Sequence, residues 1–203
     1  MRLVKSLIVA LAIMSAVPAW AQAPEGTRMR IRGTVERLEG QTLIVKSRSG
    51  DALAMNFPAG TMVVGMVKSS LADIKSGDFV GVTSINGENG ERQALEVHIF
   101  PEAMRGTNEG QVPWDLTPDS LMTNGAISGS ASAAKGQKLT VNYKGRETEV
   151  TVTPQTPIVA FAPADASLLK PGAAVLVQVL KQPDGSMTVL RVNAEKDGVK
   201  PPM

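Results

Sequence analysis

The sequence predicts an all-β protein made of two small barrels that follow one another along the chain. Short segments rich in Val, Ile and Thr alternate with turns rich in Gly, Asn, Asp and Pro. No segment after the N-terminus sustains a helical period. The order of these segments is repeated once, and each copy of about 70 residues holds enough strands to close into a ring without exposed edges.

Residues 1–21 are expected to be an export signal. Arg2 and Lys5 precede an apolar run over residues 7–14, which is too short for a membrane span of about 20 apolar residues. Small residues at 19 and 21 favour cleavage after residue 21, because cleavage after residue 23 would place Pro24 at the scissile bond. We therefore expect the mature chain in the periplasm, or secreted, without an integral membrane segment.

Residues 29–100 form the first predicted barrel unit. The segment begins "MRIRGTVERLEGQTLIVKSRSGDALAMNF", continues through "TMVVG", and ends in a hairpin that joins residues 79–85 to residues 94–100. Its β-branched runs are short and are bounded by turn residues, which is typical of strands. Closure into an OB-like or SH3-like barrel would remove the free edges of these strands.

Residues 122–194 form the second predicted barrel unit, and its segments match those of the first unit in order. Gly33-Thr34-Val35 corresponds to Gly125-Ala126-Ile127, and the final hairpin joins residues 174–180 to residues 187–193. The segment from residue 101 to residue 121 is expected to be a structured crossover, since it has several turn dipeptides. The polar residues 195–203 are expected to be a disordered tail.

Composition narrows the function classes. The chain has no cysteine, which excludes a disulfide framework, so the fold must be held together by core burial. The formal net charge is +2, and Lys and Arg are scattered among Glu and Asp. A nucleic-acid binder is expected to carry a basic stripe; because the sequence indicates none, nucleic acid is not a predicted partner.

Two stretches resemble a known family. The pattern Gly33-Thr-Val, Leu43-Ile-Val and "LADIKSGDFVGV" (residues 71–82) is similar to exported bacterial domains of unknown function, a family thought to form tandem OB-like barrels. The stretch "HIFPEAMRGTNEGQVPWD" (residues 98–115) resembles the signature of a subgroup that joins two such units. That subgroup usually has a second histidine where this chain has Gln111, which argues against a two-histidine metal site.

The crossover and the strand before it hold the candidate site residues. They include the only histidine of the chain, three carboxylates, an arginine and a tryptophan, together with two apolar residues: His98, Phe100, Glu102, Met104, Arg105, Glu109, Trp114 and Asp115. As a ligand site, the histidine, the carboxylates and the indole would line a cleft between the barrels.

A structural role for the same residues is the preferred interpretation. Phe100, Met104 and Trp114 would then form an apolar wedge, and Glu102 or Glu109 would pair with Arg105 to fix the crossover. His98 shares the outward face of its alternating strand with Glu96, so we expect its side chain to point away from the barrel core.

The sequence favours a non-enzymatic binding or scaffolding protein of the cell envelope, whose partner is an envelope protein or polymer and which needs no cofactor. One alternative is a divalent-metal-binding protein that uses His98, Glu102, Glu109 and Asp115. A second alternative is a hydrolase with His98 as its base. No G-x-S-x-G elbow and no phosphate-binding glycine loop supports the enzymatic alternative.

Overall fold

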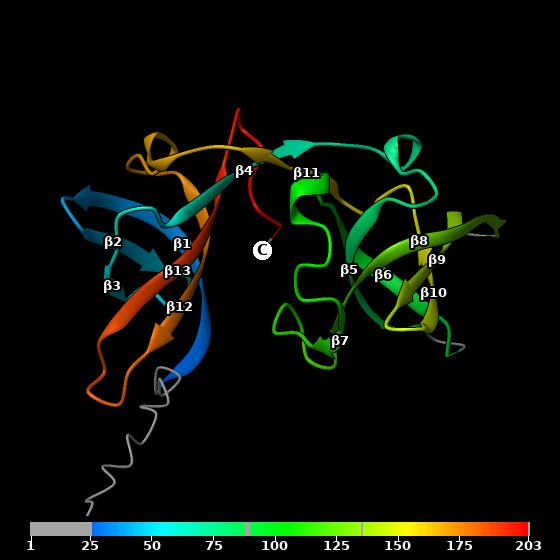
Figure 1. Cartoon of the computed structure of the whole chain (residues 1–203), viewed down its shortest axis with the longest axis horizontal. Helices are drawn as coiled ribbons and strands as arrows, with labels where there is room; N and C mark the ends of the chain where they lie inside the picture. Colours follow the sequence, from blue (N-terminus) through cyan, green and yellow to red (C-terminus); the bar gives the residue numbers. More distant parts are fainter. Residues whose placement is uncertain (1–25, 88–89, 135, 203) are drawn as a thin grey trace, which may run out of the picture.

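The computed structural model describes residues 26–87, 90–134 and 136–202, and the described chain is all-β (Figure 1). The expected export signal, residues 1–21, lies outside the described residues. The strands are β1 (Thr27–Glu39), β2 (Thr42–Ser47), β3 (Ala52–Asn56), β4 (Met62–Lys68), β5 (Phe79–Asn86), β6 (Arg92–Ile99), β7 (Gly110–Pro113), β8 (Leu121–Ala133), β9 (Gly136–Tyr143), β10 (Arg146–Val152), β11 (Ile158–Pro163), β12 (Ala174–Lys181) and β13 (Met187–Glu195). Three short 3-10 helices connect them: η1 (Leu71–Asp73), η2 (Glu102–Met104) and η3 (Ala166–Leu168).

Strands β1, β2, β3, β12 and β13 form the first lobe, on the left of Figure 1. Their pairings run β3–β2–β1–β12–β13, and a single parallel pair between Thr188 and Asn56 returns from β13 to β3. Alternate residues of these strands fill one core, which includes Leu43, Val45 and Val177. This lobe therefore combines the beginning and the end of the described chain.

Strands β5, β6, β8, β9 and β10 form the second lobe, on the right of Figure 1. Their pairings run β10–β9–β8–β5–β6, and a parallel pairing of Val150 and Thr151 with β6 returns to β10. Val80, Leu139 and Val150 belong to its separate core. All five strands come from one continuous stretch, residues 79–152.

Strands β4 and β11 cross between the lobes as an antiparallel pair centred on Met66 and Phe161 (Figure 1). β4 also pairs with β13 of the first lobe, and β11 pairs with β6 of the second. The two central side chains form a third buried cluster with Val64 and Val159. The parallel pairing of β4 with β13 corresponds to the parallel pairing of β11 with β6. The repeat in the sequence therefore becomes a pseudo-twofold arrangement in space.

The prediction that each repeat closes on itself is wrong, because each lobe takes strands from both repeats. In the repeat of residues 29–100, the hairpin of β5 and β6 lies in the second lobe; in the repeat of residues 122–194, the hairpin of β12 and β13 lies in the first. If each final hairpin folded back onto its own repeat, β4 and β11 would lose their pairing with each other. The all-β class is confirmed, while the OB-like or SH3-like assignment stays a prediction.

Gly33 and Gly125 occupy equivalent crowded positions in the two lobes. A Cβ atom at Gly33 would lie 2.1 Å from the carbonyl oxygen of Lys46, and one at Gly125 would lie 2.2 Å from that of Asn142. Gly33 pairs with Val175, and Gly125 pairs with Val80. Both glycines are needed because the neighbouring strand approaches closer than any side chain would allow.

The crossover and the chain end are more ordered than expected. The crossover contains η2 and β7, and β7 pairs with β8 from Gly110 to Pro113. Residues 195–202 do not form a disordered tail: Lys196 and Val199 make a small bridge, and Pro201 is buried. Within the described residues, none of the helices has the length and apolar character needed to cross a membrane.

Candidate functional site

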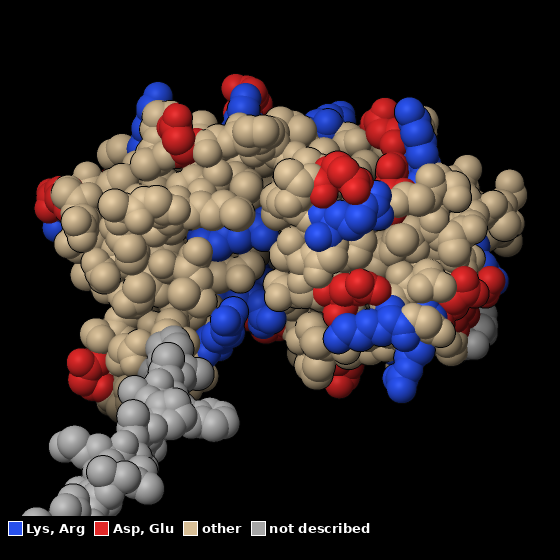
Figure 2. Space-filling view, viewed as in Figure 1, with Lys and Arg blue, Asp and Glu red and all other residues tan. Residues whose placement is uncertain are grey.

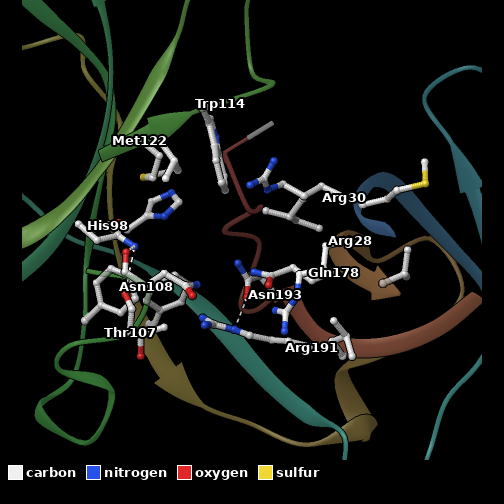
Figure 3. A pocket seen from close by; sticks show the side chains of 18 of the residues that line it. Arg28, Arg30, His98, Thr107, Asn108, Trp114, Met122, Gln178, Arg191 and Asn193 are labelled. Atoms are coloured by element: carbon white, nitrogen blue, oxygen red, sulfur yellow. Dashed lines mark hydrogen bonds between the residues drawn. The ribbon is translucent and has the colours of Figure 1, made fainter. Parts of the chain in front are cut away.

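A cavity of about 330 Å³ lies between the two lobes (Figure 3). Its first wall is the outer face of β1, β12 and β13, and its second wall comes from β6, β8 and the crossover. Phe161 of β11 also contributes to its lining. The volume is within the range of cavities that bind small molecules.

Alternation along β1 places Arg28, Arg30 and Arg32 on one face of the strand, opposite the core residue Ile31. Arg30 pairs with Gln178 of β12, and Gln178 pairs with Arg191 of β13. Two guanidinium groups and one amide thus project from neighbouring positions of three adjacent strands. Figure 2 shows Lys and Arg side chains in the hollow between the lobes.

Arg191 is a partly buried cation of this wall. Its Nε donates to Oδ1 of Asn193 at 3.0 Å, and its guanidinium lies 4.8 Å from the ring centroid of Phe161. Among the described residues it forms no ion pair, and its buried NH2 group has no hydrogen-bond partner. Burial lowers the pKa of Arg191 to about 10, so the group remains charged at neutral pH.

Trp114 and Asp115 bring the crossover against β1. The guanidinium of Arg30 stacks 3.8 Å from the ring centroid of Trp114, and NH2 of Arg32 donates to Oδ1 of Asp115 at 2.9 Å. Partial burial raises the pKa of Asp115, but the Arg32 hydrogen bond and the charges of Arg32 and Arg30 outweigh it, so the pKa lies below its usual value. One carboxylate therefore serves two arginines.

The second wall presents His98 and, behind it, Glu96. Figure 3 shows His98 beside Met122, across the cavity from Arg28 and Arg191. His98 is 5% exposed and Glu96 is 2% exposed, and their Nε2 and Oε1 atoms lie 3.6 Å apart. The hydroxyl of Thr83 donates to the same carboxylate oxygen at 2.7 Å.

Several buried polar atoms around the cavity have no hydrogen-bond partner. In the described part of the chain these include two donors, Nε1 of Trp114 and NH2 of Arg191, together with Nε2 of His98. The unpaired acceptors are Oδ1 of Asn124, whose amide nitrogen is bonded to the carbonyls of Thr107 and Asn108, and Oε2 of Glu96 behind His98. A cavity with positive charge and spare donors suits a ligand that is negatively charged and rich in acceptors.

The structure divides the predicted site residues into two groups. His98, Phe100 and Trp114 line the cavity, and Asp115 fixes its edge through Arg32. The remaining four lie outside its lining: Glu102, Met104, Arg105 and Glu109. The expectation that His98 points outward from its own lobe is consistent with its place beside Glu96, but its side chain is buried and its ring packs edge-on against Phe161 of β11.

The residues outside the lining have structural contacts. Glu102 and Arg105 form the expected ion pair, with both hydrogen bonds at 2.6 Å on the exposed surface. Met104 packs against the central cluster. Glu109 does not pair with Arg105; it accepts a hydrogen bond from the backbone of Lys144 at 2.8 Å. These contacts support the structural interpretation for this part of the crossover.

The four residues of the metal alternative do not come together. Within the described ranges, no group of three or more His, Asp or Glu side chains is arranged to hold a metal ion. Asp115 is paired with Arg32, and Glu102 with Arg105. The donor set for the predicted divalent-metal site is therefore dispersed.

Sequence reasoning missed the arginine wall. The prediction of scattered cations is wrong at this place, because Arg28, Arg30, Arg32 and Arg191 gather on one face of the first lobe. The alternation of "TRMRIRG" could have shown that three of them share a face. No pattern in the sequence indicated that Arg191 joins this wall, because that depends on where β13 lies in the sheet.

Comparisons with known proteins give one family match. Residues 124–193 match the model of a domain of unknown function (DUF5666). No curated protein and no solved structure gives a significant match. The matched segment runs from β8 to β13, so its strands are divided between the two lobes. This chain is thus similar, over that segment, to a domain family to which no function is attached.

Proposed function

We propose that this protein is an exported, non-enzymatic binding protein that holds a small organic anion in the cavity between its lobes. The observation that carries the proposal is Arg191, a desolvated cation with no carboxylate partner among the described residues. Export rests on the signal expected in residues 1–21.

The cost of burying the charge of Arg191 supports the proposal that the ligand is an anion. A cation removed from water is costly unless an anion compensates it. Asp115 offsets Arg32 and part of Arg30, whereas Arg191 contacts, among the described residues, the neutral Asn193 and the ring of Phe161. A bound anion would supply the missing charge and would accept hydrogen bonds from the unpaired donors.

The surroundings of His98 favour binding over hydrolysis. In a triad-type hydrolase the histidine lies within hydrogen-bond reach of a hydroxyl or thiol nucleophile. In the described residues, Nε2 of His98 has no hydrogen-bond partner, and the nearby hydroxyl of Thr83 donates to Glu96 instead. His98 is better placed as a donor to a ligand than as a catalytic base.

The test is thermal stabilisation by simple anions, with phosphate as the probe at constant ionic strength. Phosphate is expected to raise the melting temperature of the wild type and of the control variant Arg37→Gln, because Arg37 lies on β1 in an exposed ion pair with Glu39. Arg191→Met should abolish the increase. If phosphate, sulfate and carboxylates all leave the wild-type melting temperature unchanged, the protein is not an anion-binding protein of this kind.

A further inference from the structure

We infer that the ligand is a phosphate monoester with an apolar, ring-containing body, bound with its phosphate on the arginine wall. This inference rests on the proposed anion-binding function and narrows its ligand class. It depends on two features of the cavity: the excess of guanidinium groups over carboxylates on one wall, and the apolar side chains in its lining.

The charge on the first wall matches a dianion better than a monoanion. Three arginines line this wall, Arg28, Arg30 and Arg191. Arg32 lies next to them on the same face of β1, where Asp115 pairs with Arg32 and Arg30. A phosphate monoester carries a charge of about −1.5 to −2 at neutral pH, and its three terminal oxygens can accept from several planar donors. A single carboxylate offers half the charge and fewer acceptor positions.

The row across β1, β12 and β13 has the spacing for such a group. Arg30, Gln178 and Arg191 are direct cross-strand neighbours, so their Cα atoms are about 4.8 Å apart from strand to strand. Stacking on Trp114 orients Arg30, and a hydrogen bond to Asn193 orients Arg191. Held guanidinium groups lose less conformational entropy when they bind an anion.

Apolar side chains share the lining of the cavity with these polar groups, and one of them, Phe161, contacts the guanidinium of Arg191. Phe100, Phe161 and Met122 come from three different strands or connections, and Val112 of β7 completes this side. The rings of Phe100 and Phe161 are in contact, with centroids 4.8 Å apart. Inorganic phosphate would leave this surface uncovered, whereas a ring attached to the phosphate would bury it and gain from the hydrophobic effect.

The experiment compares four probes by calorimetric titration of the full chain. Phenyl phosphate has the charge and the ring, inorganic phosphate lacks the ring, benzoate has one charge and the ring, and benzyl alcohol is neutral. Phenyl phosphate is expected to bind at least tenfold more tightly than either inorganic phosphate or benzoate, and benzyl alcohol should show no binding. Arg191→Met should weaken phenyl phosphate at least tenfold, while Arg37→Gln should match the wild type.

A second variant separates the ring from the phosphate. Val112 is 46% exposed, so Val112→Ala should fold normally, and it is expected to weaken phenyl phosphate several-fold without affecting inorganic phosphate. Equal affinity for phenyl phosphate and inorganic phosphate would overturn the inference that the ligand has an apolar body. Equal affinity for phenyl phosphate and benzoate would overturn the inference that its charged group is a phosphate. Either result would leave the proposed anion binding intact. If none of the three anions bound, the proposed function itself would fail.

Discussion

Equivalent positions in the two lobes share the residues that build the strands but differ in those that face the cavity. Gly33 and Gly125 have the same crowded contact with the neighbouring strand, and Val35 and Ile127 are buried in the two cores. Three residues before each glycine, however, the repeats differ: Arg30 in the first repeat corresponds to Met122 in the second. The interior of each lobe is alike, and the difference lies in the outer faces.

The difference is largest on β13 and β6. Asn193 pairs with Val64 on β4, and His98 pairs with Val159 at the matching position on β11. Two residues before them, Arg191 corresponds to Glu96. One wall of the cavity is therefore cationic and the other holds a buried acid and a histidine, so a ligand between them meets two unlike surfaces. Two identical walls would present the same groups to both ends of a ligand.

Engineered disulfides would give the largest effect and would test the exchange of strands between the repeats. Thr27 pairs with Lys181, and residues in antiparallel pairs have Cα atoms about 4.5–5.5 Å apart, within disulfide range. Because the chain has no cysteine, T27C/K181C should form an intramolecular disulfide quantitatively, measured by intact mass with and without reductant.

The control for this crosslink is T27C/N86C, which places the second cysteine at the corresponding residue of the first repeat. Residue 86 lies in the second lobe, so this pair should stay reduced in the monomer. Crosslinking of T27C/N86C in place of T27C/K181C would show that the repeats close on themselves.

Alanine at Gly33 or Gly125 should destabilise the protein strongly and to a similar extent. The added Cβ would overlap a backbone carbonyl that cannot move without breaking strand pairing, so we expect a loss of about 3 kcal/mol or more in the free energy of unfolding. Gly129→Ala is the control, because its nearest neighbour would be 3.4 Å away. Urea unfolding measures all three. A much smaller loss at one of the two glycines would show that the lobes are not equivalent there.

Asp115→Asn should remove the charge interaction that joins the crossover to β1 of the first lobe. Arg32 is buried and Asp115 is half exposed, so we expect a loss of about 1–2 kcal/mol, less than for a fully buried pair. The folded-state pKa of Asp115 is lowered, so its stabilising effect is complete above the unfolded pKa and is lost as the pH falls through the folded value.

The pH dependence provides the check on Asp115. The stability difference between the wild type and Asp115→Asn should be constant near neutral pH and should shrink below about pH 4, near the ordinary range of a carboxyl group. A difference that stayed the same at acid pH would mean that the charge of Asp115 is not what stabilises Arg32.

Arg191→Met should give the smallest change, and in the opposite direction. Removal of a desolvated charge should raise the stability of the ligand-free protein by up to about 1 kcal/mol, partly offset by the lost contacts to Asn193 and Phe161. Thermal unfolding without added anions measures it. A clear loss of stability would indicate that Arg191 is held for the fold and not for a ligand.

The sequence was sufficient for the strands and turns but not for their partners. Val, Ile and Thr runs bounded by turn residues identified the hairpins of β5–β6 and β12–β13. A strand contributed by the other repeat makes the same local contacts as one contributed by its own repeat. The exchange depends on β4 and β11 pairing with each other around Met66 and Phe161, which is a long-range contact.

The candidate site was predictable only in part, for the same reason. The crossover signature pointed to His98 and Trp114, which do line the cavity. The face of His98 followed from alternation, whereas its burial involves Phe161 of β11, which is distant in sequence. Arg191 lies beside Arg30 only through Gln178 of β12, a neighbour that no spacing in the sequence reveals.

The continuous stretch that forms the second lobe has a consequence for the order of folding. Residues 79–152 contain all the strands of that lobe, so it can close without waiting for the two ends of the chain. In the first lobe, the paired strands β1, β2 and β3 must wait for β12 and β13 from the far end of the chain. Its contacts span most of the chain, which predicts slow closure. The arginine wall, and with it the cavity, is therefore assembled last.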